Sequence, residues 1–266
     1  MHTRKWLQSI LLLGLGLYFL ENMLTGRIYF YINERFGWLS WIATAIFLTL
    51  GIIGILDLRR QHLEDHTEHD HTDHDHAAHE HEPEEHAHAG HQHGTAPSWP
   101  ILGLVALPLA LGLLVPAKPL GASAVGTSGV STSFSSVQGS GSTTQLDVAP
   151  TDRNVLDWVR VFNSSASVDD VNGQQADVIG FVYRDIRFKD TSQFMVARFA
   201  ISCCVADASA IGVIAQWPKA ATLAQDSWVH VKGTFAVQTF DGQRTPILVV
   251  DSLDPTNQPD HPYLYP

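Results

Sequence analysis

The chain of 266 residues has only two cysteines, and the stretch that holds most of its histidines, residues 62–93, has none. Without thiolate ligands this stretch is poorly suited to Cu(I) or to an iron–sulfur cluster. The same stretch lacks Lys and Arg but holds ten Asp or Glu residues. Removing these ten acids from the net charge of −11 leaves −1 for the rest of the chain, so the acidity is concentrated in one short segment.

Motifs that mark common enzymes are also missing. There is no Gly-rich phosphate loop and no nucleophile elbow, and residues 151–266 offer only His230 and His261 as conventional bases. We therefore expect a protein without enzymatic activity. Residues 151–266 contain nine Lys or Arg and thirteen Asp or Glu, a net charge of −4. Because binding of a nucleic-acid backbone needs a basic groove, we expect no nucleic-acid partner.

Twelve of the fifteen histidines lie in residues 62–93, where His-x-His pairs recur between carboxylates. Neutral imidazole offers a ring nitrogen to a borderline metal, and the carboxylates add oxygen ligands. The stretch therefore predicts binding of Zn(II), or of Ni(II), Co(II) or Cu(II), through interchangeable ligand sets rather than one closed site. The predicted metal ligands are His62, His66, His69, His71, His74, His76, His79, His81, His86, His88, His91 and His93.

Two other interpretations of the histidine stretch do not require a metal. A polar run with few aliphatic residues cannot bury enough apolar surface to fold, so residues 61–97 are predicted to be a disordered loop. Such a loop can serve as an inert spacer. It can also respond to pH, because protonating its histidines below about pH 6 would cancel its negative charge.

Three apolar segments indicate a membrane protein. They run from about Trp6 to Leu24, Gly37 to Leu58 and Ser98 to Val115, and each approaches the roughly 20 residues that cross a bilayer. We expect two transmembrane helices in residues 1–60 and a third in residues 98–117. The first could instead be a signal peptide, but no small-x-small cleavage site follows it. The third is short and carries Pro108, which would also suit a re-entrant segment.

Basic residues near the spans give a weak signal for the orientation in the membrane. With the N-terminus inside, four flanking basic residues face the cytoplasm and three face outward. The multi-pass topology that follows has a cytoplasmic histidine loop and an extracytoplasmic C-terminal domain. Between the third span and that domain, residues 118–150 are predicted to be a flexible tether. Seventeen of the 24 residues from 121 to 144 are Gly, Ser or Thr.

Residues 151–266 predict an all-β domain with a short leading helix. Apolar residues recur on one face of Asn154–Phe162, which indicates the helix. Five segments have the alternation and the turns of β-strands: Gln175–Phe188, Phe194–Ser202, Ile211–Trp217, Trp228–Thr239 and Thr245–Asp251. Five strands with a long first one favour an OB-like barrel, and an SH3-like barrel is the nearest alternative.

The adjacent cysteines, Cys203 and Cys204, leave three interpretations open. One of them can pack into the barrel, since free cysteine is often buried. They can also form a thiol or metal-ligand site with Asp207. A strained disulfide between them would need an oxidising compartment. Alternation along the predicted strand places the two side chains on opposite faces of the sheet.

Several motifs together resemble one family. They are RFAISCCVAD (residues 198–207), the W-V-x-V-x-G strand that starts at Trp228, and the P-D-x-P-Y-x-Y terminus that starts at Pro259. With the three spans and the histidine loop, they resemble the YcgQ-type family of uncharacterised bacterial membrane proteins. The resemblance implies a permease subunit that is encoded beside a multi-span permease. It implies no particular biochemical activity.

The leading hypothesis is therefore a membrane-anchored accessory subunit of a permease that handles a divalent transition metal such as zinc. Its expected partners are a multi-span permease, metal ions and the lipid bilayer. A first alternative is a non-catalytic protein-interaction module in which the histidine loop is only a spacer. A second alternative is an envelope sensor of thiols or metal centred on the two cysteines.

Overall fold

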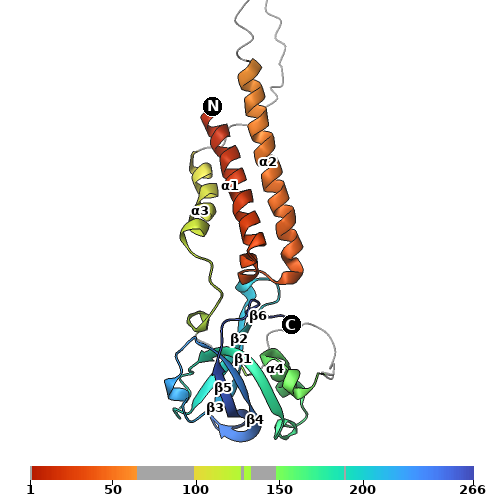
Figure 1. Ribbon diagram of the computed structural model, residues 1–266, viewed down its shortest axis with the longest axis vertical. Coiled ribbons are helices and arrows are strands. Elements are labelled where there is room, and N and C mark those ends of the chain that lie inside the picture. The colour runs from red at the N-terminus through yellow and green to blue at the C-terminus, as the bar shows by residue number, and fades with distance from the viewer. Residues whose placement is uncertain (1, 65–98, 127–128, 133–147, 189) are drawn as a thin grey trace, which may run out of the picture. The chain divides into compact units, whose positions relative to one another are not determined.

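A computed structural model describes residues 2–64, 99–126, 129–132, 148–188 and 190–266. They form two compact units, which Figure 1 shows as a helical part and a part built around a sheet. The helical unit contains Met1–Gly26 and Trp38–Ala117, and the sheet unit contains Arg27–Gly37 and Lys118–Pro266. The sheet unit therefore includes the short connection between the first two helices.

The helical unit consists of three apolar helices, α1 (His2–Leu24), α2 (Gly37–Glu64) and α3 (Trp99–Leu114). The segments Thr3–Leu24 and Glu34–Arg60 are long and apolar enough to cross a membrane, with mean hydropathies of 1.5 and 2.2. Helix α3 has 16 residues, with Pro108 inside it. At 1.5 Å per residue it is about 24 Å long, shorter than a bilayer core of about 30 Å. Two of the three predicted spans are thus full-length apolar helices, and the third is shorter.

Helix α2 extends further than the sequence predicts. It ends at Glu64 rather than near Leu58, so that residues 61–64 of the predicted disordered loop are helical in backbone. His62 is among them. The other eleven predicted ligands, from His66 to His93, lie outside the described residues.

Helix α1 is packed closely against both of its neighbours. A Cβ atom on Gly16 would lie 2.7 Å from the side chain of Leu48 in α2. Towards α3, the Tyr18 hydroxyl donates to the carbonyl oxygen of Gly112 at 3.3 Å, and Figure 1 shows α1 between α2 and α3. Close approach at glycine is typical of helices that pack together in a membrane.

The sheet unit contains the five predicted strands in the predicted order, followed by a short sixth. They are β1 (Gln175–Tyr183), β2 (Gln193–Ala200), β3 (Ser209–Gln216), β4 (Trp228–Phe240), β5 (Gln243–Pro255) and β6 (Tyr263–Leu264). β1 pairs with β4, β4 with β5, β5 with β3, β3 with β2, and β2 with β1, so the pairing of five strands closes on itself. Within this ring only β3 and β5 are parallel.

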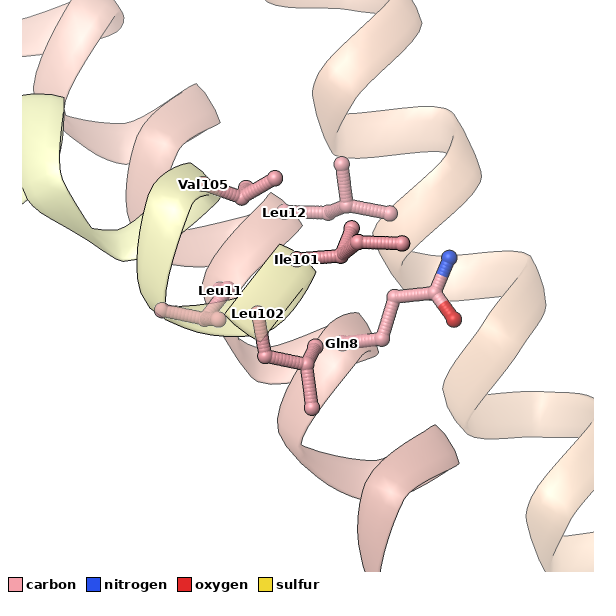
Figure 2. A pocket seen from close by; sticks show the side chains of 6 residues that line it. All are labelled: Gln8, Leu11, Leu12, Ile101, Leu102 and Val105. Atoms are coloured by element: carbon pink, nitrogen blue, oxygen red, sulfur yellow. The ribbon is translucent and has the colours of Figure 1, made fainter. Parts of the chain in front are cut away.

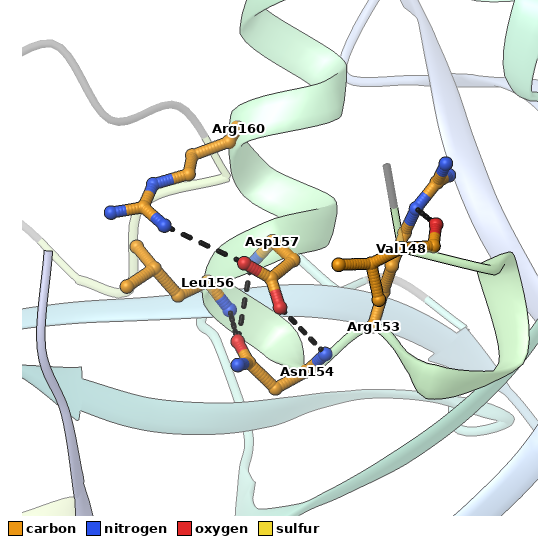
Figure 3. A network of polar contacts seen from close by, with 6 residues as sticks. All are labelled: Val148, Arg153, Asn154, Leu156, Asp157 and Arg160. Carbon is orange, nitrogen blue, oxygen red and sulfur yellow. Dashed lines mark hydrogen bonds and ion pairs between the residues drawn. The ribbon is translucent and has the colours of Figure 1, made fainter. Parts of the chain in front are cut away.

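The predicted leading helix is present as α4 (Val155–Ser164), and it covers part of the core. It begins at a capping box, shown in Figure 3: the Asn154 side chain accepts the Asp157 N–H at 3.1 Å, and the Asp157 carboxylate accepts the Asn154 N–H at 3.2 Å. The apolar face of α4 places Trp158 against Phe235 of β4, with ring centroids 4.6 Å apart.

The predicted tether between the third span and the domain is wrong for the residues that the structure describes there. Ala122 and Val130 are buried in the same apolar cluster as Phe181 of β1. Ser131 forms a parallel bridge with Ile211 of β3. A Gly/Ser-rich composition suggested flexibility, but the few apolar residues between the glycines are enough to pack this segment onto the sheet. Residues 133–147, the rest of the Gly/Ser-rich stretch, lie outside the described residues.

Candidate functional site at the cysteine turn

Cys203 and Cys204 lie in a turn beyond the end of β2. The strand stops at Ala200, before the predicted end at Ser202, so strand alternation does not separate the two side chains. Their sulfur atoms are 3.7 Å apart, which corrects the expectation that they point to opposite faces. Cys203 is exposed and Cys204 is half-buried, and neither belongs to the two apolar clusters of the core. The packing role expected for one cysteine is therefore not found.

Asp207 closes this turn from the short 3₁₀ helix Val205–Asp207. Its two carboxylate oxygens accept the backbone N–H groups of Ser202 at 2.9 Å and Cys203 at 2.7 Å. Burial opposes ionisation of this carboxyl, but hydrogen bonds from Cys203 and the backbone lower its pKa overall. In return, the hydrogen bond with Asp207, helped by Cys204, raises the pKa of the Cys203 thiol to about 11. At neutral pH Cys203 is therefore a thiol beside a carboxylate, and not an activated nucleophile.

The connection between α1 and α2 is docked on the cysteine turn. Ile32 forms an antiparallel bridge with Cys204, the Asn33 N–H donates to the Cys203 carbonyl at 3.0 Å, and Val205 N–H donates to the Tyr31 carbonyl at 2.9 Å. These contacts make a short strand pair between residues 31–33 and residues 203–205. The connection thus adds backbone hydrogen bonds to the sheet unit in the manner of an extra strand.

Asn33 fixes this docking with its side chain. The side chain is buried, with 3% exposed, and its Nδ2 atom donates to the Ser202 carbonyl at 2.8 Å. Its Oδ1 atom accepts the Arg35 N–H at 3.0 Å and caps the 3₁₀ helix Glu34–Phe36. One buried amide therefore satisfies groups on both partners of the strand pair.

Arg198 of β2 holds the C-terminal segment from inside the sheet unit. Its guanidinium donates to the carbonyl oxygens of Pro262 at 2.9 Å and His261 at 2.8 Å, and it lies 5.2 Å from the ring centroid of Trp228. Burial lowers its pKa to about 10, which leaves the group charged at neutral pH. Arg198 therefore brings together the three motifs that suggested the family.

Tyr263 joins three separate segments beside the cysteine turn. It lies on β6, which pairs in parallel with β2. Its hydroxyl donates to the Phe30 carbonyl at 3.1 Å and accepts the Leu120 N–H at 2.8 Å, and burial raises its pKa. Two residues before it, the Nδ1 atom of His261 lies 2.5 Å from a carboxylate oxygen of Glu34. The connection, the segment after α3 and the C-terminus are thus tied to one another.

The three residues predicted as a thiol or metal site are brought together, but as a hydrogen-bonded turn. Both Asp207 oxygens already accept backbone N–H groups, and the carboxylate also accepts a hydrogen bond from the Cys203 thiol. Among the residues that the structure describes, no three His, Cys, Asp or Glu side chains converge into a group that could hold a metal ion. What remains at this turn is a close pair of thiols.

Sequence reasoning missed the connection Arg27–Gly37, because it was treated as a simple link between spans. One signal was available: RIYFYINERFG is long for a helical hairpin, and IYFYI is rich in β-branched and aromatic residues. Arg198 begins the motif RFAISCCVAD, but the sequence alone predicted no structural role for it. A lone arginine in an otherwise apolar strand indicates that a segment with unpaired carbonyl groups packs against that strand and accepts its hydrogen bonds.

Two of the hollows among the described residues lie away from the turn. In the helical unit a cavity of about 100 Å³ lies between α1 and α3, and Figure 2 shows Gln8 as the one polar side chain among its labelled residues. In the sheet unit a cavity of about 320 Å³ lies between residues 187–193 and the β4–β5 turn. Its main cation, Arg187, is already paired with Asp185 at 2.7 Å. The rest of its lining includes Asp190, Gln193, Thr239 and Asp241.

Two domains of one family match nearly the whole chain. The DUF1980 N-terminal domain matches residues 7–131, and the DUF1980 C-terminal domain matches residues 137–266. The chain belongs to this YcgQ-type family. Its N-terminal family domain contains both the docked connection and the segment after α3. The two domains are therefore interleaved within the sheet unit and are not folded separately.

Two curated relatives of this YcgQ-type protein extend the comparison. The UPF0703 protein YcgQ of Bacillus subtilis is 30% identical over 95 residues, which are 35% of this chain and 33% of that protein. The chain thus matches about a third of that relative's length. A Streptococcus mutans protein named "Putative two-component membrane permease complex subunit" is 24% identical over 287 residues, covering 94% of each chain.

Proposed function

We propose that this protein is the accessory subunit of a bacterial membrane permease, with no enzymatic activity of its own. The observation that carries the proposal is the match along 94% of both chains to a protein named as a permease complex subunit. The two apolar helices support a location in the plasma membrane. The partner would be a multi-span permease.

We propose further that all three helices cross the bilayer. Residues 31–33 and residues 118–126 belong to the same sheet unit, so they lie on the same side of the membrane. If α2 crosses from that side, the chain must cross again before residue 118. Among the residues that the structure describes between α2 and residue 118, α3 is the one helix available for this return, and Val115 adds one more helical hydrogen bond to it. The histidine stretch then lies opposite the sheet unit.

The flanking charges support this arrangement. Basic residues on the side of the histidine stretch are Arg4, Lys5, Arg59 and Arg60, and those on the side of the sheet unit are Arg27, Arg35 and Lys118. The small excess on the first side makes it the cytoplasmic one. The sheet unit would then be extracytoplasmic. Reporter fusions after Gly94 and after Ser142 test this, because the two readings must be opposite; equal readings would show that α3 does not cross.

We propose that the sheet unit is an OB-type barrel. The closed ring of five strands, in which the third and fifth strands are parallel, supports this proposal. OB-type barrels bind partners on an exposed strand face or between loops. This suits a domain whose task is to contact another protein.

The metal-handling part of the proposal comes from the sequence alone. Twelve imidazoles with ten carboxylates would gather Zn(II), Ni(II), Co(II) or Cu(II) near the permease on the cytoplasmic side. Since protons compete for the same nitrogens, binding must weaken as the pH falls below about 6.5. The interaction-module and sensor alternatives share the permease partner but give the stretch no metal.

Affinity purification of the full-length protein in mild detergent tests both parts. The expected result is a co-purified multi-span permease, together with metal at pH 7.5 that is lost at pH 5.5. The matched variant lacks residues 65–93 and keeps α2 and α3 intact. It should retain the permease and lose the metal. Failure to recover a permease would contradict the subunit role, whereas equal metal in both proteins would contradict only the role of the histidines.

A further inference from the structure

The cysteine turn combines two features that the subunit role does not use. Two thiols lie side by side, one of them exposed, with sulfur atoms 3.7 Å apart. The peptide that joins them is the one on which the α1–α2 connection is docked, through the Cys203 carbonyl and the Ile32–Cys204 bridge. Any chemistry that changes the shape of this peptide therefore acts on the docking.

We propose that Cys203 and Cys204 form a reversible dithiol–disulfide site that is oxidised by a low-molecular-weight disulfide, and that oxidation loosens the docked residues 31–33. The site lies apart from the histidine stretch and does not depend on metal binding. Its reactants are the two thiols of this chain and one external disulfide. Its products are a Cys203–Cys204 disulfide and two small thiols.

The reaction proceeds in two balanced steps. The exposed Cys203 thiol loses its proton, and the thiolate attacks one sulfur of the external disulfide. The external S–S bond breaks, and its other half leaves and takes up a proton as a free thiol. The Cys204 thiol then loses its proton and attacks the Cys203 sulfur, which expels the second small thiol. Two electrons pass from the cysteine pair to the external disulfide.

Ring closure must deform the turn. Neighbouring Cα atoms across a trans peptide are about 3.8 Å apart, whereas disulfide-linked residues usually have Cα atoms roughly 4.4–6.8 Å apart. The peptide between the cysteines must therefore change its orientation when the sulfurs join. Its carbonyl accepts the Asn33 N–H in the structure, so this bond is the first to be weakened. For the same reason the disulfide is easily reduced, which makes the change reversible.

The turn also restrains premature oxidation. The Asp207 carboxylate accepts a hydrogen bond from the Cys203 thiol and raises the pKa of that thiol to about 11. At neutral pH little of Cys203 is therefore ionised, so its attack on a disulfide is slow. Because residues 31–33 belong to the connection between α1 and α2, the oxidation state is conveyed to the segment that joins the end of α1 to the start of α2.

The test uses the full-length protein in detergent and oxidised glutathione as the probe. Mass spectrometry should show that the wild type loses both free thiols without keeping a glutathione adduct. Cys203→Ser and Cys204→Ser, which each retain one thiol, should keep the adduct because no second thiol can expel it. A persistent adduct on the wild type, or two unreacted thiols, would overturn the proposal.

Amide hydrogen exchange then tests the coupling to the connection. The amides of Asn33 and Val205, which make the strand pair, should exchange at least several-fold faster in the oxidised wild type and recover after reduction. The double variant Cys203→Ser/Cys204→Ser, treated in the same way, should show no change. Oxidation that leaves the exchange of these two amides unaltered would refute the loosening of residues 31–33.

Discussion

The helical unit and the sheet unit place their large apolar side chains in opposite ways. In α2, Ile46 and Leu50 are both 50% exposed, whereas in the sheet unit Phe235 is 1% exposed. A water-soluble helix would turn such residues inward, so α2 has the surface of a segment surrounded by lipid. The sheet unit has the buried core of a domain in water. The exposed apolar surface of α2 therefore suits lipid, whereas the sheet unit suits water. Residues 27–37 lie between two apolar helices in the sequence but belong to the sheet unit.

The largest expected effect comes from truncating one apolar side chain in each unit. Phe235→Ala removes a ring that packs on Trp158 at 4.6 Å, and should destabilise the sheet unit by about 3–5 kcal/mol. Leu50→Ala removes an exposed side chain of α2 and should change stability by less than about 0.5 kcal/mol. Urea unfolding of both variants in detergent, followed by near-ultraviolet circular dichroism, measures the difference. Equal losses would mean that the Leu50 face of α2 is packed against protein.

A smaller effect is expected where the connection between α1 and α2 is docked on the cysteine turn. Asn33→Ala removes a buried donor to Ser202 and the cap of Arg35, which should cost about 1–3 kcal/mol locally. The Val205 amide, which donates to Tyr31, should then exchange roughly ten- to a hundredfold faster.

The matched control for this change is Asn172→Ala. Asn172 accepts the Val237 N–H in an exposed position at 3.2 Å, so its loss should leave exchange at Val205 unchanged. If Asn33→Ala and Asn172→Ala gave the same exchange rate at Val205, residues 31–33 would not be held by the Asn33 side chain.

The same comparison explains what could be predicted from the sequence. Apolar runs and strand alternation are local patterns, so α1, α2 and β1 to β5 occur near their predicted positions. The end of β2 at Ala200 was missed by two residues, and this error changed the account of Cys203 and Cys204. Local alternation cannot show where a strand stops when the next residues are held by Asp207.

Contacts between segments that are distant in the sequence could not be predicted from local patterns. The docking of Asn33 on Ser202 and of Tyr263 on Phe30 joins residues that are 169 and 233 positions apart. The composition of Arg27–Gly37 indicated an extended segment, but no local pattern identified its partner. The segment around Ala122 was misjudged for the same reason: its glycines and serines outweighed the few residues that pack.

The smallest expected effect concerns the chemistry of one thiol. The hydrogen bond to Asp207 raises the pKa of Cys203 from its ordinary 9.0 to about 11, since a nearby negative charge disfavours the thiolate. Asp207→Asn removes the charge, so the pKa must fall toward 9.0. At pH 9 the thiolate fraction would then rise by up to about fiftyfold. A less basic thiolate is also less nucleophilic, with a Brønsted slope of about 0.4–0.5, which leaves a net increase in alkylation rate of roughly fivefold.

This increase can be measured with iodoacetamide in a Cys204→Ser background, where only Cys203 is labelled. The matched control is Asp254→Asn on β5, which removes one negative charge without touching the turn and should leave the rate unchanged. The rate ratio between the two variants should also fall as the pH rises, and reverse above about pH 11, because both thiols are then ionised and the more basic Cys203 thiolate is the better nucleophile. A rate ratio near one at pH 9 would mean that the Asp207 carboxylate holds the backbone of the turn but has no influence on the thiol.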